Sequence, residues 1–359
     1  MSTAYSTRAS LGWTLTRLLP VAMALALVSQ AYALNLAEAW AAAPARPDAI
    51  TTRLELLTAS NTLVRTEADP LALRLDLLQA QQSVELLEAQ HRHALFASLQ
   101  EVAEAYTGVL QAREQAKLAS GGLELSEAAL EVAQIRFANG GATSFDVRDA
   151  EISVEEARQG VEAATNGLGV ARANLEGMIG REIDAAELEP VPDELQAMVA
   201  SYDQVIAELD QHPTLLQAAQ GVALARTAVD LLDPSYASLA QIESAKTQLS
   251  TAEELVGEAH RGFELQARNA YLQVETSADR REVATQRVAA AQERFDLQKV
   301  RLDGGLISQM QLDQASLELQ QQRLELLVAE HENLMALLRL QTATMYDIGF
   351  APAITEGGL

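Results

Sequence analysis

Cysteine is absent from this 359-residue sequence. Its absence excludes a disulfide framework, a thiolate nucleophile, a cysteine-based zinc site and a lipid anchor on an N-terminal cysteine. Aromatic residues are also scarce, at 4% of the chain with six phenylalanines. That is little material for the thick core of an ordinary globular domain. Long helices packed side by side bury narrow seams of small aliphatic residues, so they need few aromatic side chains.

Basic residues are few as well. The chain has 26 lysine and arginine residues against 50 acidic ones, for a net charge of −24. Residues 1–33 contain two arginines and no acidic residue, so the rest of the chain has a net charge of −26. Nucleic-acid binding requires clustered basic side chains, and an acidic protein is repelled by anionic lipid. We therefore expect no nucleic-acid partner.

Long hydrophobic runs are missing too. The most apolar stretch, Leu18–Val28, is far shorter than the ~20 residues that span a bilayer. It follows Arg8 and Arg17 and precedes Ala31-Tyr32-Ala33, a small-x-small cleavage pattern. We interpret residues 1–33 as a signal peptide for export, with a retained N-terminal anchor as the alternative.

Proline is absent from two long stretches, Leu71–Glu189 and Ser235–Ala351. Both are rich in good helix formers, and proline disrupts helix interiors, so the sequence predicts an all-α protein. Glycine pairs and Asp-Pro dipeptides punctuate the helical pattern. The predicted helices are about 48–68, 71–138, 144–178, 214–232 and 235–302, and a last helix after the second glycine turn reaches about 346.

The sequence contains a copy of itself. Ala105-Tyr106, Arg136, Gly140 and Ala150 recur 165 positions later as Ala270-Tyr271, Arg301, Gly305 and Ala315. Such a repeat predicts one long helical hairpin made twice. The expected organisation is a signal peptide at 1–33, a first hairpin repeat at 34–180, a linker at 181–211 with a short helix around 195–209, a second repeat at 212–349 and a tail at 350–359.

Apolar residues mark a contact seam on each helix that follows a glycine turn. Their alternating spacing of three and four is typical of left-handed coiled-coil packing. In the long helix before the first turn, Gly121-Gly122 interrupts a matching seam that runs from Leu95 to Phe137, so we expect a bend there. The seam positions are Val147, Ala150, Val154, Ala157, Val161, Ala164, Leu168, Ala171, Leu175 and Met178, and in the second copy Leu312, Ala315, Leu319, Gln322, Leu326, Ala329, Asn333, Ala336, Leu340 and Ala343.

Helix lengths predict how the elements stack. At ~1.5 Å per residue, the long helix of the first repeat spans ~100 Å, and the shorter helices before and after it together span ~84 Å. Two short helices stacked end to end therefore nearly match one long helix. The linker is then expected at mid-height, where the stack is broken.

The doubled turn signature resembles the TolC-type outer-membrane efflux proteins. It reads RFANGGATSFDV from Arg136 and RLDGGLISQMQL from Arg301, with His212-Pro213 and Leu34–Ala39 as further points of likeness. The resemblance implies a homotrimer whose hairpins form a coiled-coil α-barrel, a tunnel across the periplasm associated with the outer membrane. It also implies two partners, a periplasmic adaptor protein and an inner-membrane transporter.

The sequence departs from that family at one place. The family inserts membrane β-strands between the first and the long helix of each repeat, whereas this chain has only Asp69-Pro70 and Asp233-Pro234 there. A membrane β-strand requires roughly 9–11 residues. We therefore expect no transmembrane β-strands, and only a possible contact with the outer membrane.

Two carboxylates near the first glycine turn are the candidate lumen constriction. Asp146 and Asp149 are three residues apart and share one helix face. The resemblance implies that carboxylates here line the tunnel, where three copies form a cation-favouring ring. The second copy has Gln311 and Gln314 instead. The alternatives are an acidic first helical turn that suits the helix dipole, or a solvated face.

The turns themselves are the candidate docking tips for the adaptor: Gly140, Gly141, Thr143, Gly304, Gly305 and Ser308. Ordinary turn and N-cap chemistry is the alternative, and both can hold at once. The five histidines are scattered, and His91 and His93 point to different faces of a helix. No metal-ligand motif, phosphate-binding loop or nucleophile motif is recognisable, so we expect no metal, no cofactor and no catalytic residue.

These observations predict a passive duct component of an efflux or export system. Its rival is a non-conducting coiled-coil protein that spaces or tethers envelope layers. A third hypothesis is a decayed relative of the ducts with no transport role. A hollow axis and the direction faced by Asp146 and Asp149 distinguish the first hypothesis from the others.

Overall fold

The computed structural model describes residues 34–196, 201–233 and 235–349. The predicted signal peptide and the predicted C-terminal tail lie outside these residues. Within them the structure consists of α-helices, short 3-10 turns and irregular connections, with no β-strand. The all-α prediction is confirmed for this part of the chain. None of its helices is long and apolar enough to cross a membrane.

The two repeats have matching long helices. The glycine turns join α3 (Arg74–Ala138) to α4 (Ser144–Ile179) and α7 (Leu239–Asp303) to α8 (Gln309–Thr344). Both α3 and α7 have 65 residues, and both α4 and α8 have 36. The remaining elements are α1 (Leu36–Trp40), α2 (Pro47–Ala68), α5 (Tyr202–Ile206), α6 (Pro213–Asp230) and 3-10 turns at Ala43–Ala45, Ala185–Glu187, Asp193–Gln196 and Leu209–Gln211.

The predicted helix at 195–209 is wrong in its extent. A 3-10 turn ends at Gln196, and the separate helix α5 covers only Tyr202–Ile206. Ser201 is the reason for the restart, since its hydroxyl accepts a hydrogen bond from the Gln204 N–H while the Gln204 side chain accepts one from the Ser201 N–H. This capping box begins a new helix within the predicted one.

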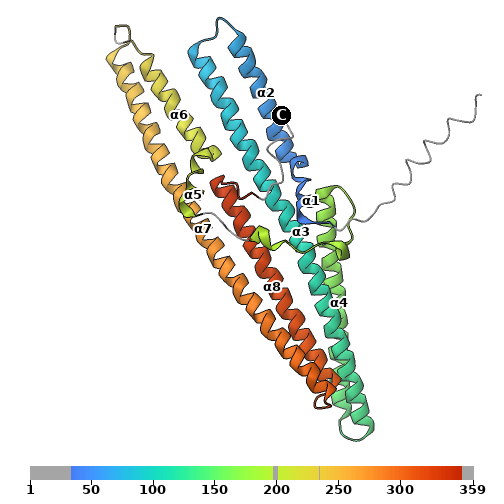
Figure 1. Ribbon diagram of the computed structural model, residues 1–359. Helices are drawn as coiled ribbons and strands as arrows, with labels where there is room; N and C mark the ends of the chain where they lie inside the picture. Colours follow the sequence, from blue (N-terminus) through green and yellow to red (C-terminus); the bar gives the residue numbers. More distant parts are fainter. Residues whose placement is uncertain (1–33, 197–200, 234, 350–359) are drawn as a thin grey trace, which may run out of the picture.

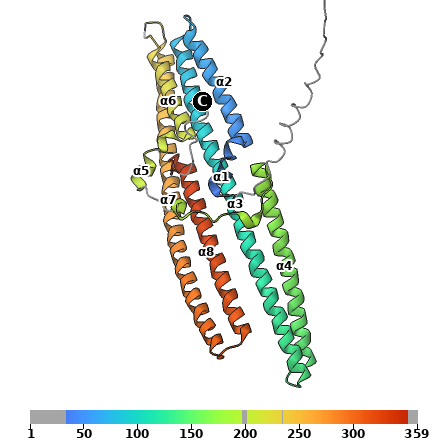
Figure 2. The same cartoon turned by 45° about the vertical axis from the view of Figure 1, so that its right-hand side comes forward.

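Short helices stack along the long ones as expected. In Figures 1 and 2, α2 and α4 follow each other along α3, and α6 and α8 follow each other along α7. The Asp-Pro junctions lie at one end of the molecule and the glycine turns at the other. The linker between α4 and α6 crosses at mid-height, as predicted from the helix lengths.

The four rows of helices form one open, curved layer. In its upper half the principal contacts run from α2 to α3, α6 and α7, and in its lower half from α4 to α3, α8 and α7. Each inner helix thus has a neighbour on both sides. The outer helices, α2 and α4 at one edge and α7 at the other, have a principal neighbour on one side only.

The coiled-coil seam predicted for α4 is confirmed in every position. From Val147 to Leu175 its seam residues are buried or half-buried, and every other residue in that interval is exposed. The seam on α3 holds from Leu95 to Leu130, but Phe137 is 49% exposed and lies outside it. Near the glycine turn, therefore, Phe137 of α3 no longer packs in the seam.

Gly121 lies at a close contact between α3 and α8. The helix α3 continues through it, and a Cβ atom placed there would lie 3.1 Å from Leu317 Cδ1 of α8. Glycine at this position therefore permits close approach of the two hairpins. Consistent with that contact, α8 buries a second stripe against α3 in addition to its predicted seam on α7.

The main core is a belt at mid-height. It joins α1, the middle of α3, the end of α4, the linker and the end of α8. Trp40, Leu99, Tyr106, Leu175 and Leu337 are all at most 2% exposed within it.

Candidate functional site: the glycine tips and the open edges

Each glycine tip is closed by the same backbone motif. Gly140 and Gly305 have φ angles of +71° and +69°, which L-residues with a Cβ rarely adopt. The Gly141 N–H donates to the Arg136 carbonyl at 2.7 Å, and the Leu306 N–H donates to the Arg301 carbonyl at 2.9 Å. This is a Schellman motif, which satisfies the last carbonyls of the long helices.

Only one glycine of each predicted pair is required by its backbone angle. Gly304 has a φ of −81°, and the residue at the equivalent place in the first copy is Asn139 with a φ of −93°. Gly141 likewise lacks a positive φ. Among these four glycines, only Gly140 and Gly305 therefore adopt the left-handed conformation.

Capping boxes begin the return helices. In the first copy, Asp146 Oδ2 accepts hydrogen bonds from the Thr143 N–H at 2.7 Å and from the Thr143 hydroxyl at 2.9 Å. In the second copy, Gln311 Oε1 accepts from the Ser308 N–H at 3.0 Å. The bonds from Thr143 hold the pKa of Asp146 below its usual range. Both Asp146 and Asp149 are exposed, and the carboxylate of Asp146 is ionised and bound to its own helix cap.

Three ion pairs run in register along α7 and α8. Arg280 pairs with Glu332 at 3.4 Å, Arg287 with Glu325 at 3.7 Å and Arg294 with Glu318 at 3.0 Å. The arginines rise by seven residues while the glutamates fall by seven, as expected for an antiparallel coiled coil. We call this set the Arg-Glu ladder. Each exposed rung contributes little stability by itself, ~0–1 kcal/mol.

The ladder indicates on which side of the layer Asp146 lies. Gln311 is seven residues before Glu318 and so lies on the same flank of α8. Asp146 is its counterpart in the first copy, 165 residues earlier. In α4 the positions matching the three glutamates are Ser153, Gly160 and Gly167. Among the α4 positions that match Gln311 and the three glutamates, Asp146 is therefore the one acidic residue.

A groove of 850 Å³ follows the ladder between α3 and α7. Its apolar floor includes Leu118, Val283, Leu324 and Val328, and two of the ion pairs line it. The linker crosses the opposite face, where Asp193 lies 3.7 Å from Arg281. We call the face that carries the ladder and this groove the grooved face.

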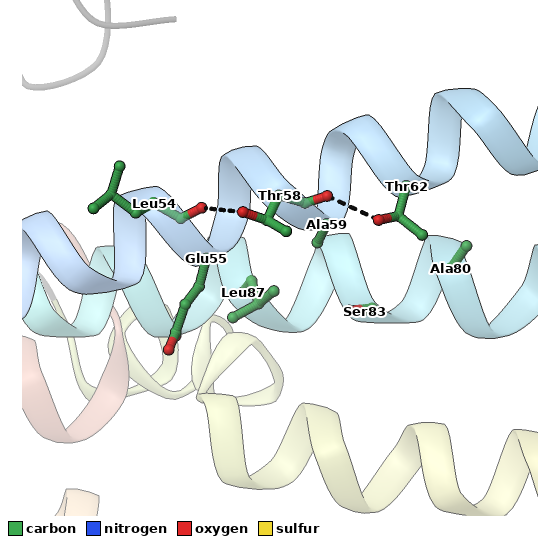
Figure 3. A pocket seen from close by; sticks show the side chains of 8 residues that line it. All are labelled: Leu54, Glu55, Thr58, Ala59, Thr62, Ala80, Ser83 and Leu87. Atoms are coloured by element: carbon green, nitrogen blue, oxygen red, sulfur yellow. Dashed lines mark hydrogen bonds between the residues drawn. The ribbon is translucent and has the colours of Figure 1, made fainter.

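A second groove, between α2 and α3, has no recognisable chemistry. It has a volume of 460 Å³ and is lined by small residues such as Ala59, Ala80 and Ser83. Figure 3 shows that Thr58 and Thr62 turn their hydroxyls to the carbonyls of Leu54 and Thr58, at 2.8 and 2.9 Å. These hydroxyls are satisfied within their own helix, so the groove is a packing seam.

Tyr106 fastens the linker to α3, a role that sequence reasoning missed. Its ring is fully buried, and its hydroxyl lies 2.7 Å from the Leu34 carbonyl and 2.6 Å from the Glu189 carbonyl. Burial raises the pKa of Tyr106, so the hydroxyl remains a donor. Arg113 adds bonds of 3.0 Å to the carbonyls of Ala185 and Leu188. The repeat pair Tyr106 and Tyr271 was the only sequence signal.

His91 and His93 contact different elements of the structure. His91 faces α2, where its Nδ1 lies 3.0 Å from the Thr52 hydroxyl, whereas His93 packs edge-on against His212 at 5.4 Å between ring centroids. Burial and the neighbouring His93 lower the pKa of His212 to about 4. In the described part of the chain, no three histidine, aspartate or glutamate side chains form a group that could hold a metal ion.

Comparisons with known proteins agree with this architecture. Residues 76–181 match the family described as "Outer membrane efflux protein". A search of curated proteins gives no match. The match to that family agrees with the expected link to the outer membrane.

Solved outer-membrane channels share the fold. The outer membrane protein VceC from Vibrio cholerae is 17% identical, with a TM-score of 0.59 over 86% of this chain and 95% of VceC. The open state of the MtrE channel from Neisseria gonorrhoeae is 16% identical, with a TM-score of 0.57 over 86% of this chain and 88% of MtrE.

The outer-membrane channel OprN is 13% identical, with a TM-score of 0.61 over 88% of this chain and 91% of OprN. At these identities the likeness establishes the fold alone. The resemblance to the TolC-type outer-membrane efflux proteins is thereby confirmed, in fold over most of the chain and in sequence over residues 76–181.

Proposed function

We propose that three copies of this chain close into a periplasmic duct that serves an efflux or export system. The observation that carries the proposal is the open layer of helices, which ends in α2 and α4 at one edge and in α7 at the other. Two different edges favour head-to-tail association, which produces a closed ring when the rotation between copies is suitable. The family match and the shared fold support the same conclusion.

In this proposal the grooved face lines the tunnel and the linker surrounds it as a belt. The register of the Arg-Glu ladder supports placing Asp146 on the inner side, and Asp149 lies one helical turn further along α4. Three copies then bring six carboxylates together in one narrow ring, which favours cations and repels anions. Transport is passive, because a water-filled duct has no means of coupling to an energy source.

The glycine tips are the proposed docking points for a periplasmic adaptor and, through it, an inner-membrane transporter. Gly140, Gly141 and Thr143 are exposed in the first copy, as are Gly304, Gly305 and Ser308 in the second. The Schellman motif and the capping box hold each tip in a defined shape, which suits recognition by a partner.

The test is the oligomeric state of the protein without residues 1–33, measured by light scattering coupled to size-exclusion chromatography. We expect a trimer, and a monomer at all concentrations would exclude the duct. Since the chain has no cysteine, introduced pairs report on the edges directly. Val170→Cys on α4, combined in turn with Leu272→Cys, Glu275→Cys or Asp279→Cys on α7, should give disulfide-linked dimers and trimers.

End-on electron micrographs distinguish the duct from the rival coiled-coil spacer. A hollow ring supports conduction, whereas a trimer with a filled centre supports the spacer. For the ion ring, Asp149→Asn tests charge without touching the cap of Asp146. A duct should then lose preference for cations in a conductance assay of the assembled system, while Asp313→Asn in the second copy, half-buried and separate from the tip carboxylates, should not change it.

A further inference from the structure

Large apolar side chains are exposed at the Asp-Pro end of the molecule. Leu71 and Leu73, after the first junction, are 85% and 67% exposed. At the second junction Leu231, Tyr236 and Leu239 are 62%, 91% and 81% exposed. Figure 1 shows that both junctions lie at the same end, away from the glycine tips. We call these five residues the apolar end surface.

Local hydrogen bonds fix the backbone that presents this surface. Asp69 Oδ1 accepts from the Leu71 N–H at 2.9 Å, and Asp233 Oδ1 accepts from the Ser235 N–H at 2.7 Å. Both are Asx turns, in which an aspartate carboxylate replaces a backbone acceptor. The side chains that follow are therefore held outward by an ordered turn rather than folded back on the helices.

The surface has no charge of its own but is bordered by charge. Residues 70–73 and 235–242 contain no acidic or basic side chain, although 21% of the chain is Asp, Glu, Lys or Arg. Behind them lie Asp69, Arg74, Asp76, Asp233 and Glu243, which together carry a net negative charge. Tyrosine is enriched at bilayer interfaces, and exposed leucines gain free energy when they leave water for an apolar environment.

We propose that the apolar end surface inserts into the interface of a zwitterionic lipid bilayer. The net negative charge behind this surface selects against an anionic bilayer, since like charges repel across the surface. The proposal concerns the end opposite the adaptor and so rests on the proposed duct for its orientation. At the first glycine tip, by contrast, the exposed Phe145 is followed directly by charged residues, Asp146, Arg148 and Asp149.

Flotation with phosphatidylcholine vesicles tests the proposal. The triple variant Leu71→Gln, Tyr236→Gln, Leu239→Gln should bind at least 100-fold more weakly than the unmodified protein, because each leucine removed from an apolar environment costs about tenfold. The matched control is Phe145→Gln with Leu306→Gln, which are 72% and 77% exposed at the glycine tips. The control should bind vesicles as the unmodified protein does, and vesicles containing anionic lipid should bind all forms more weakly.

A spectroscopic variant locates the contact. Trp40 is buried, so a tryptophan introduced as Tyr236→Trp is the accessible reporter once residues 1–33 are removed. We expect brominated lipid to quench this tryptophan and to leave Trp40 fluorescence unchanged in the parent protein. All substituted positions are exposed, so circular dichroism should show full helicity.

Three outcomes would contradict the proposed insertion of the apolar end surface into lipid. They are absence of vesicle binding, loss of binding in the glycine-tip control, and undiminished binding in the triple variant. A halved particle mass of the triple variant without vesicles would show that the surface joins two assemblies end to end. Failure of the duct itself is seen separately, as a monomer by light scattering or as absent cross-links between α4 and α7.

Discussion

Replacing Tyr106 by phenylalanine tests how the linker is held. Tyr106 is fully buried at the centre of the mid-height belt, and its hydroxyl reaches the carbonyls of both Leu34 and Glu189. Phenylalanine keeps the ring and its packing. The substitution therefore removes only the hydroxyl that joins the N-terminal segment and the linker to α3.

The magnitude follows from the acceptors left behind. The Leu34 carbonyl keeps a second bond from the Glu189 N–H at 3.1 Å, so it is not left without a donor. The Glu189 carbonyl loses its bond from Tyr106. One lost hydrogen bond with partial loss of satisfaction at a buried carbonyl predicts a decrease of about 1–2 kcal/mol in the free energy of unfolding.

The chain offers its own control in Tyr271, the repeat counterpart of Tyr106. Tyr271 is half-buried and stacks edge-on against Tyr202 at 5.5 Å between ring centroids. Tyr271→Phe keeps that contact and should change stability by less than about 0.5 kcal/mol. Urea unfolding followed by circular dichroism at one protein concentration measures both variants. Equal effects of the two substitutions, or no effect of Tyr106→Phe, would refute the argument.

Three further predictions concern other elements. Gly305→Ala should lower the free energy of unfolding by about 1–2 kcal/mol, because φ at this position is +69°. The adjacent Gly304→Ala, where φ is −81°, should not lower it. Urea unfolding measures both variants, and the opposite ranking would contradict the turn assignment. Ser277→Ala should cost about 1–3 kcal/mol by removing the 3.0 Å bond to buried Asn333, with exposed Thr285→Ala near zero in the same assay. The lowered pKa of His212, about 4 in the folded protein against 6.5, means that the unfolded chain binds a proton first, so stability falls as pH drops from about 6.5 towards 4. His212→Asn keeps an N-cap acceptor for the Thr214 N–H and should flatten thermal stability between pH 6.5 and 5; an unchanged slope would show that other groups cause it.

Helices with one neighbour were the most predictable part of the fold. The return helix α4 packs on α3 alone, so its period of three and four residues marks every buried position. The equivalent helix α8 lies between α7 and α3 and buries a second stripe that includes Leu317. That stripe depends on how the two hairpins meet, which a local pattern does not specify. The contact between Gly121 and Leu317 could not be predicted for the same reason.

The tips depend on contacts between residues that are close in the sequence, whereas the linker depends on contacts between residues that are far apart in it. The turn glycines and caps depend on bonds within six residues, and the sequence identified them correctly. The linker depends on partners far along the chain, such as Tyr106 and Glu189, 83 residues apart. Its path across α3, α8 and α7 was therefore not predictable, although its height was. The roles assigned to Asp146, Asp149 and the docking tips stay predictions.

The contacts that close each glycine tip determine how far the two repeats can differ from each other. Each turn is closed by contacts among its own few residues, so a substitution in one copy imposes no adjustment on the other. The exchange of Asp146 and Asp149 for Gln311 and Gln314 illustrates this freedom, since glutamine at position 311 caps its helix as aspartate does at 146. The charge at the glycine tips can therefore differ between the two copies while the backbone there keeps the same shape.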